Sequence, residues 1–162
     1  MKTNYNCPKF VNILANMLCP TESQIIRDFE EISKLQSGKF LPNRYASKLL
    51  EIISRKIIDK AEFLADDFGI IINGELIKEP HRKYCLIFNL IPEYHNLLRS
   101  IPFISCSAAI AEINQENDIL TAKKIESALL ITPMLDYFYW TDSGKSNSYD
   151  KNMKISCLLY TS

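Results

Sequence analysis

Two short segments hold the polar residues best suited to chemistry. One is the acidic pair Asp66 and Asp67, which ends a short apolar run that begins at Glu62 and is predicted to be a buried strand. The other is the polar loop from Asn89 to Asn96, which follows a strongly apolar segment. Ligand sites favour the ends of sheet strands, where main-chain and side-chain groups converge. These two segments are therefore the candidate sites.

Each segment also has a purely structural interpretation. Adjacent aspartates commonly form a solvated turn, and a lone histidine such as His95 is more often a surface residue than a catalyst. A zinc site is disfavoured because neither His81 nor His95 lies near a close pair of cysteines. With four glycines in all, the chain also lacks the glycine-rich phosphate loop of the Walker or Rossmann type.

The elements that must position these residues begin with helices. Apolar residues at helical spacing predict a first helix from Pro8 to Leu18. After Pro20, a capping-box pattern formed by Thr21 and Gln24 predicts the start of a second helix, which continues to about Gln36. A third helix is predicted from about Arg44 to Lys60.

Beyond Ala61 the pattern changes to strands. Asn73-Gly74 is a strong two-residue hairpin signal between the apolar runs Ile70–Ile72 and Leu76–Ile77. A strand that is apolar on both faces, as a central strand is, is predicted at Tyr84–Leu90. Later strands are predicted at Pro102–Glu112 and, joined by a turn at Pro133, at Leu129–Ile131 and Tyr137–Thr141. Helices followed by strands predict an α+β class, with residues 1–162 as one domain in a layered sandwich.

Composition excludes several classes of partner. The 19 basic and 19 acidic residues balance, so charge gives no reason to expect nucleic acid or an anionic membrane. No run of residues is long and apolar enough to span a membrane. An odd, scattered set of cysteines without a CxxC pair indicates reduced thiols in a cytoplasmic protein: Cys7, Cys19, Cys85, Cys106 and Cys157.

In order and spacing, five segments resemble the inositol monophosphatase family. The first, an N-terminal helical segment at Arg27–Phe29, occupies the place of a family helix. Phe63–Gly69 is similar to the family's F-[IL]-x-E-E-x-G, and Tyr84–Leu97 to its W-I-[IV]-D-P-[IL]-D-G-T-x-N-F. The strand G-[IF]-P-x-F-x-x-S-I-[AG]-L corresponds to Ser100–Ile110, and N-P-x-x-[DG]-E-[LM]-[FY]…G-x-G to Thr132–Lys145.

This resemblance implies a fold and a reaction. The fold is a layered α/β sandwich in which long helices pack on a mostly antiparallel sheet, and this chain corresponds to its N-terminal portion. The reaction is magnesium-dependent hydrolysis of an inositol or sugar phosphate monoester. Carboxylates hold the metal, which polarises the phosphate and lowers the pKa of the attacking water.

Carried over residue by residue, the implied metal site is depleted. Asp66 stands for the first metal-binding glutamate, and Asn89 replaces an aspartate and loses its charge. Ile91 can offer only its backbone carbonyl, and Pro92 replaces the bridging aspartate. Residues 44–46 lie where the family often has an assisting aspartate, and no carboxylate is present there. The cofactor implied is magnesium, or none.

The implied phosphate site is altered too. Glu93 replaces a glycine, which sets an anion where the substrate phosphate approaches, and Tyr94 replaces the threonine that helps to position the water. An alternative is that Glu93 acts as a displaced metal ligand after a one-residue slip. The resemblance thus predicts that Asp66 and Asn89 meet at neighbouring strand ends, and that Ile91–Asn96 opens a short helix.

The end of the sequence adds a second departure from the family. The family's distal W-D-x-A-x-G segment has no match, and Cys157–Ser162 is interpreted as a truncated or foreign end. Three hypotheses follow: an inactive or impaired phosphatase relative, a scaffold that pairs with itself or an active homologue, and an active phosphatase rearranged around Asp66, Asn89 and Glu93. An uncovered sheet face near Tyr137 and Ile155 predicts self-association.

Overall fold

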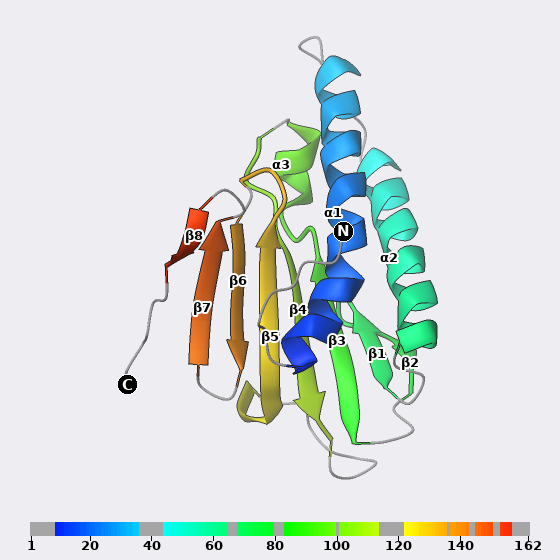
Figure 1. Ribbon diagram of the computed structural model, residues 1–162. Coiled ribbons are helices and arrows are strands. Elements are labelled where there is room, and N and C mark those ends of the chain that lie inside the picture. The colour runs from blue at the N-terminus through cyan, green and yellow to red at the C-terminus, as the bar shows by residue number, and fades with distance from the viewer. Residues whose placement is uncertain are drawn as a thin grey trace.

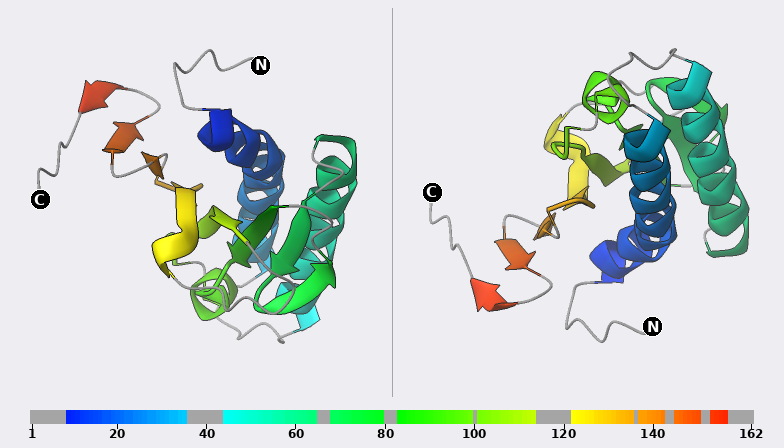
Figure 2. Two further views of the ribbon diagram at one scale, coloured as in Figure 1. Left: turned by 90° about the horizontal axis from the view of Figure 1, so that it is seen from below. Right: turned by 90° about the horizontal axis from the view of Figure 1, so that it is seen from above.

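The computed structural model describes residues 9–35, 44–64, 68–79, 83–99, 101–113, 122–135, 137–142, 145–150 and 153–156. Two long helices, α1 (Lys9–Leu35) and α2 (Arg44–Leu64), lie side by side on the same face of one large sheet (Figure 1 and Figure 2). The predicted α+β class and the layer of long helices on a mostly antiparallel sheet are confirmed.

The sheet has eight strands in the order β2-β1-β3-β4-β5-β6-β7-β8. β1 and β3 run parallel, and every other neighbouring pair is antiparallel. The short helix α3 (Tyr94–Leu98) links β3 to β4, and the 3-10 turn η1 (Ala122–Lys124) precedes β5. The strands are β1 (Gly69–Ile72), β2 (Glu75–Lys78), β3 (Tyr84–Leu90), β4 (Cys106–Glu112), β5 (Ile125–Thr132), β6 (Tyr137–Asp142), β7 (Lys145–Asp150) and β8 (Met153–Ser156).

The core lies between α1 and the centre of the sheet. Alternate residues of β3 point toward the helices, and Leu86, Phe88 and Leu90 are at most 1% exposed. The facing stripe of α1 is equally buried, as Leu14 and Met17 show. Because full burial of one such side chain contributes about 1.5–3 kcal/mol, this layer is the main source of stability. The predicted strand at Tyr84–Leu90 is confirmed with its bounds and its central position.

The prediction of two helices separated at Pro20 is wrong, because α1 continues through that residue. Thr21 is not a cap: its hydroxyl donates a hydrogen bond of 2.6 Å to the Leu18 carbonyl one turn earlier. A proline inside a helix costs about 3 kcal/mol. The continuous buried stripe from Val11 to Ile25 offsets that cost. Figure 1 shows the axis of α1 changing direction within its first half, as an internal proline causes.

The strand predicted before Asp66 is also wrong. Helix α2 extends to Leu64, four residues beyond the predicted end at Lys60, and takes up most of the short apolar run. A run of this length fits a helix end as well as a strand. Asp66 and Asp67 themselves lie outside the described residues.

The hairpin predicted at Asn73-Gly74 is confirmed. Both residues have positive φ, 51° and 83°, which is the requirement of a type I′ turn. Asn73 also ties the hairpin to β3: its N–H donates to the Phe88 carbonyl at 2.8 Å, and its Oδ1 accepts from the Leu90 N–H at 2.6 Å. One residue thus fixes the turn and the last residues of β3.

We expect Asn73→Ala to lower the free energy of unfolding by about 1–3 kcal/mol, since it loses the acceptor for Leu90 and places a Cβ residue without a local partner at positive φ. Asn73→Gly is the matched control, because it loses the same acceptor but tolerates the positive φ. Urea unfolding measures both. A stability of Asn73→Ala equal to or above that of Asn73→Gly would contradict this account.

Candidate functional site

The turn between β3 and α3 is held in an unusual backbone conformation. Ile91 has φ 48°, a left-handed value that β-branched residues rarely adopt. Such strain costs of the order of 1–3 kcal/mol and persists only where the surroundings enforce it. Here the side chain is 2% exposed, and the Ile91 N–H donates to the Ser105 carbonyl at 3.2 Å.

Glu93 fastens the same turn to the segment that enters β4. Its carboxylate accepts the Ser105 N–H at 3.1 Å and the Ser105 hydroxyl at 2.9 and 3.0 Å. Glu93 is the residue before α3, yet it makes no side-chain cap to that helix. Hydrogen bonds to a charged acceptor contribute about 1.5–3 kcal/mol, more than neutral ones. The carboxylate therefore acts as an internal clasp across the loop.

Further hydrogen bonds close the rest of the loop. The Asn96 side-chain amide donates to the Phe103 carbonyl at 2.8 Å, and the Ile101 N–H donates to the Asn96 carbonyl at 2.8 Å. The Asn96 N–H donates to the Glu93 carbonyl at 2.8 Å, which forms the first turn of α3. The predicted helix after Ile91 is confirmed, and it begins at Tyr94.

Cys106 lies directly behind this turn. Burial raises the pKa of its thiol to about 12, and a hydrogen bond with the backbone of Ile91 only partly offsets that rise. Burial likewise raises the pKa of Cys85 to about 11. Both thiols are free and buried. At neutral pH they are protonated, so neither acts as a nucleophile or a metal ligand.

The described residues do not assemble the donor set that magnesium prefers. Within that part of the chain no three acidic, histidine or cysteine side chains come together. Asn89 is exposed and sits opposite Ser107, on the sheet face away from the helices. Asn89 and the Ile91 carbonyl are neutral, whereas magnesium is usually held by at least one carboxylate. Asp66, the one carboxylate expected here, falls outside the described residues.

Parallel pairing determines which residue of the first strand neighbours the end of β3. Gly69 pairs with Cys85 and Ile72 with Phe88, so the carboxyl end of β1 lies beside the carboxyl end of β3. Asn73 therefore occupies the position where the sequence comparison expected Asp66. Sequence reasoning identified Asn73 only as a turn residue; its position after an apolar strand was the available signal.

The remaining candidates lie on the outside of the turn. Pro92 and His95 are exposed, and Tyr94 is half-buried with its ring centroid 3.9 Å from that of His95. Tyr94 also packs against the core. These contacts are those of a packed surface turn. The segment 44–46 belongs to the first turn of α2, and its side chains lie outside the described ones.

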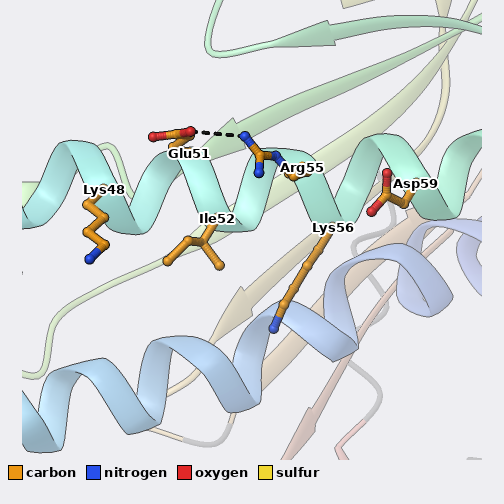
Figure 3. Close-up of a pocket in the computed structure, with 6 residues that line it drawn as sticks. All are labelled: Lys48, Glu51, Ile52, Arg55, Lys56 and Asp59. Carbon is orange, nitrogen blue, oxygen red and sulfur yellow. Dashed lines mark hydrogen bonds and ion pairs between the residues drawn. The ribbon is translucent and has the colours of Figure 1, made fainter.

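A separate groove of about 390 Å³ runs along α2. Figure 3 shows Glu51 and Arg55 pairing along the helix, at 3.1 Å, while Lys56 extends toward α1. The Lys56 ammonium donates to the Gln24 side chain on α1 at 2.9 Å, which joins the two helices. Charges of both signs line the groove, and the exposed Glu51–Arg55 pair contributes at most about 1 kcal/mol. We interpret it as a solvated helix face.

The Glu93–Ser105 clasp can be tested by a double-mutant cycle. We expect Glu93→Ala and Ser105→Ala each to destabilise the protein, with a coupling energy of about 1–3 kcal/mol between them. His95→Ala, an exposed change in the same short helix, is the control and should cost less than about 0.5 kcal/mol. Chemical unfolding gives the four free energies. Additive effects of the two substitutions would mean that the clasp contributes nothing.

Comparison with known proteins identifies the fold. The sequence matches no family model and no curated protein. Among solved structures, the chain is similar to the extragenic suppressor protein suhB from Bartonella henselae, with a TM-score of 0.66 and 17% identity over 91% of this chain and 53% of that one. It is similar to inositol monophosphatase II from Staphylococcus aureus MSSA476, with a TM-score of 0.66 and 11% identity over 90% of this chain and 49% of that one.

An inositol monophosphatase from Zymomonas mobilis gives a TM-score of 0.64 and 8% identity over 86% of this chain and 50% of that one. The chain thus spans about half the length of the solved structures that it matches. The resemblance seen in the sequence is confirmed at the level of the fold. Helices, sheet and candidate turn together have the fold of the inositol monophosphatases.

Proposed function

We propose that this chain is a relative of the inositol monophosphatases that no longer hydrolyses phosphate monoesters by itself. The observation that carries the proposal is the Glu93 carboxylate, which is bound to the Ser105 N–H and hydroxyl at the turn where the family resemblance implies a glycine and an incoming phosphate. The turn already holds an anion of its own. A substrate phosphate would have to displace it or approach it.

Electrostatics makes that approach unfavourable. Two like charges about 4 Å apart repel by about 1 kcal/mol in bulk water and by about 4 kcal/mol at an effective dielectric of 20. A phosphate monoester near neutral pH carries close to two negative charges. Glu93 is half-buried, so the repulsion lies between these limits. Each 1.4 kcal/mol weakens binding about tenfold.

The metal side of the reaction is weakened independently. Asn73, Asn89 and the Ile91 carbonyl offer neutral oxygens near the ends of β1 and β3, and the Asn73 oxygen already accepts from the Leu90 N–H. Magnesium gives up its water reluctantly and favours carboxylates. The role of Asp66 as a metal ligand remains a proposal, with Glu93 as an alternative ligand if the active hypothesis holds. We expect millimolar magnesium not to raise the thermal stability.

A non-catalytic binding role is the second candidate. It is favoured by the open face of the sheet, where Tyr137 and Tyr139 are 41% and 40% exposed. In either role we expect a protein of a reducing, cytoplasmic compartment, since Cys85 and Cys106 are free thiols. None of the described helices is both long and apolar enough to cross a membrane.

The activity assay is hydrolysis of inositol 1-phosphate with millimolar magnesium, followed by phosphate release. We expect no turnover above background from the unmodified chain. Single reversions such as Glu93→Gly should also be inactive, because phosphate approach and metal charge are both broken. Activity should return only with Asn89→Asp, Pro92→Asp, Glu93→Gly and Tyr94→Thr together, in a chimaera that carries the remaining half of an active inositol monophosphatase.

The decisive control is Asp66→Ala. Magnesium-dependent turnover by the unmodified chain that disappears in Asp66→Ala would overturn the proposal and support the hypothesis of an active, rearranged site. Turnover that persists in Asp66→Ala would indicate a contaminating phosphatase, which repeated purification removes.

A further inference from the structure

The sheet has one face without a helix on it. α1 and α2 both lie on the opposite face, as the two end-on views show (Figure 2). Side chains of the open face come from alternate positions of each strand. Within β3 to β6 the pairing register aligns them in rows: Ile87, Ala109, Ala128 and Thr141; then Asn89, Ser107, Leu130 and Tyr139.

These rows are apolar or neutral throughout. Ile87, Ala109, Ala128 and Leu130 are half-buried only by their own neighbours, while Tyr139 is 40% exposed. On the next row Tyr137 pairs with Thr132, and its ring stacks on that of Tyr139 with centroids 6.0 Å apart. No lysine, arginine, aspartate or glutamate occurs in these rows. Monomeric proteins rarely leave so large an uncharged, apolar face in water.

We propose that this face, defined by Ile87, Ala109, Ala128, Leu130, Tyr137 and Tyr139 and called the open face below, is covered by the open face of a second copy of the chain. The two copies form a symmetric dimer with sheet packed on sheet and the helices outside.

Size is the first argument for this occupant. Eight strands spaced about 4.8 Å apart span about 34 Å, and three rows of outward residues span about 20 Å. The open face therefore offers roughly 700 Å². A stable interface of standard size buries about 800 Å² per partner. A second copy can cover the whole face at once, whereas a single peptide strand or helix covers a fraction of it.

Charge is the second argument. In a symmetric dimer each patch meets its own copy, so a patch with a single sign of charge repels itself. The open face is neutral in its described residues, and the whole chain has a formal net charge of zero. Identical faces can therefore meet without any repulsion between like charges.

Shape is the third argument. A two-fold axis along the strands between β4 and β5 sets Ala109 of one copy opposite Ala128 of the other. The small alanines let the sheets approach to the usual spacing of about 10 Å. The same axis sets the large Tyr139 opposite the smaller Asn89, whose amide can accept or donate a hydrogen bond to the phenol.

The test is the mass of the purified chain in solution. Sedimentation equilibrium between about 1 and 100 µM, well below millimolar crowding, should give twice the chain mass of 18.7 kDa at the upper concentrations. Tyr139→Glu should shift the dissociation constant upward by at least tenfold, because it places two carboxylates in the interface. Phe103→Glu, which changes a 63% exposed residue outside the open face, is the matched control and should leave the dimer unchanged.

Leu130→Gln is a second variant, which adds no charge and should also weaken the dimer. Circular dichroism and cooperative unfolding confirm that each variant folds. A wild-type chain that is monomeric at 100 µM would overturn the proposal and assign the open face to a different partner. So would a folded Tyr139→Glu that dimerises as the wild type does, or a Phe103→Glu that weakens the dimer equally. The hydrolysis assay does not enter this test, so the dimer can fail while the proposed function stands.

Discussion

The pairing of β3 with β1 on one side and β4 on the other determines where every candidate residue lies. β3 buries Leu86, Phe88 and Leu90 under α1 and sends Asn89 to the opposite face. Since the period of a strand is two residues, this burial allows a single register. Antiparallel pairing with β4 then places Ser105, the residue before β4, beside the turn that follows β3. The strain at Ile91 and the clasp at Glu93 both depend on that register.

The same constraint gives the turn its chemical character. In an enzyme, donors at such a turn face an incoming anion; here the chain provides the anion from its own sequence. Glu93 satisfies the Ser105 N–H and hydroxyl, and Asn73 satisfies the Leu90 N–H. Strain at a turn is often a sign of function, because it persists only where the surroundings enforce it. In this chain the surroundings still enforce it, while the donors are engaged internally.

Much of the fold could be predicted from local patterns. The Asn73-Gly74 hairpin, the strand Tyr84–Leu90 and the helix from Arg44 follow from turn chemistry and periodicity, which act over a few residues. The interruption predicted at Pro20 failed because the buried stripe of α1 outweighs the local cost of a proline. β7, with the polar sequence from Lys145 to Asp150, was missed because it carries little apolar alternation and is held by pairing with β6.

The candidate site was predictable only in part. Sequence comparison indicated the loop Asn89–Asn96 and the anionic Glu93, yet nothing local pointed to Ser105 as its partner, twelve residues away. The role of Asn73 depends on β1 and β3 being parallel neighbours, which the sequence pattern alone did not reveal.

The central claim is that the turn after β3 is closed by its own carboxylate, and binding at that turn tests it most directly. Amide resonances of Ile91–Asn96 and Ser105 can be followed by NMR while inositol 1-phosphate is added in the presence of magnesium. The account predicts no saturable shift of these resonances in the unmodified chain up to millimolar ligand. Saturable shifts centred on Glu93 and Ser105 would show that the turn still accepts a phosphate, and would contradict it.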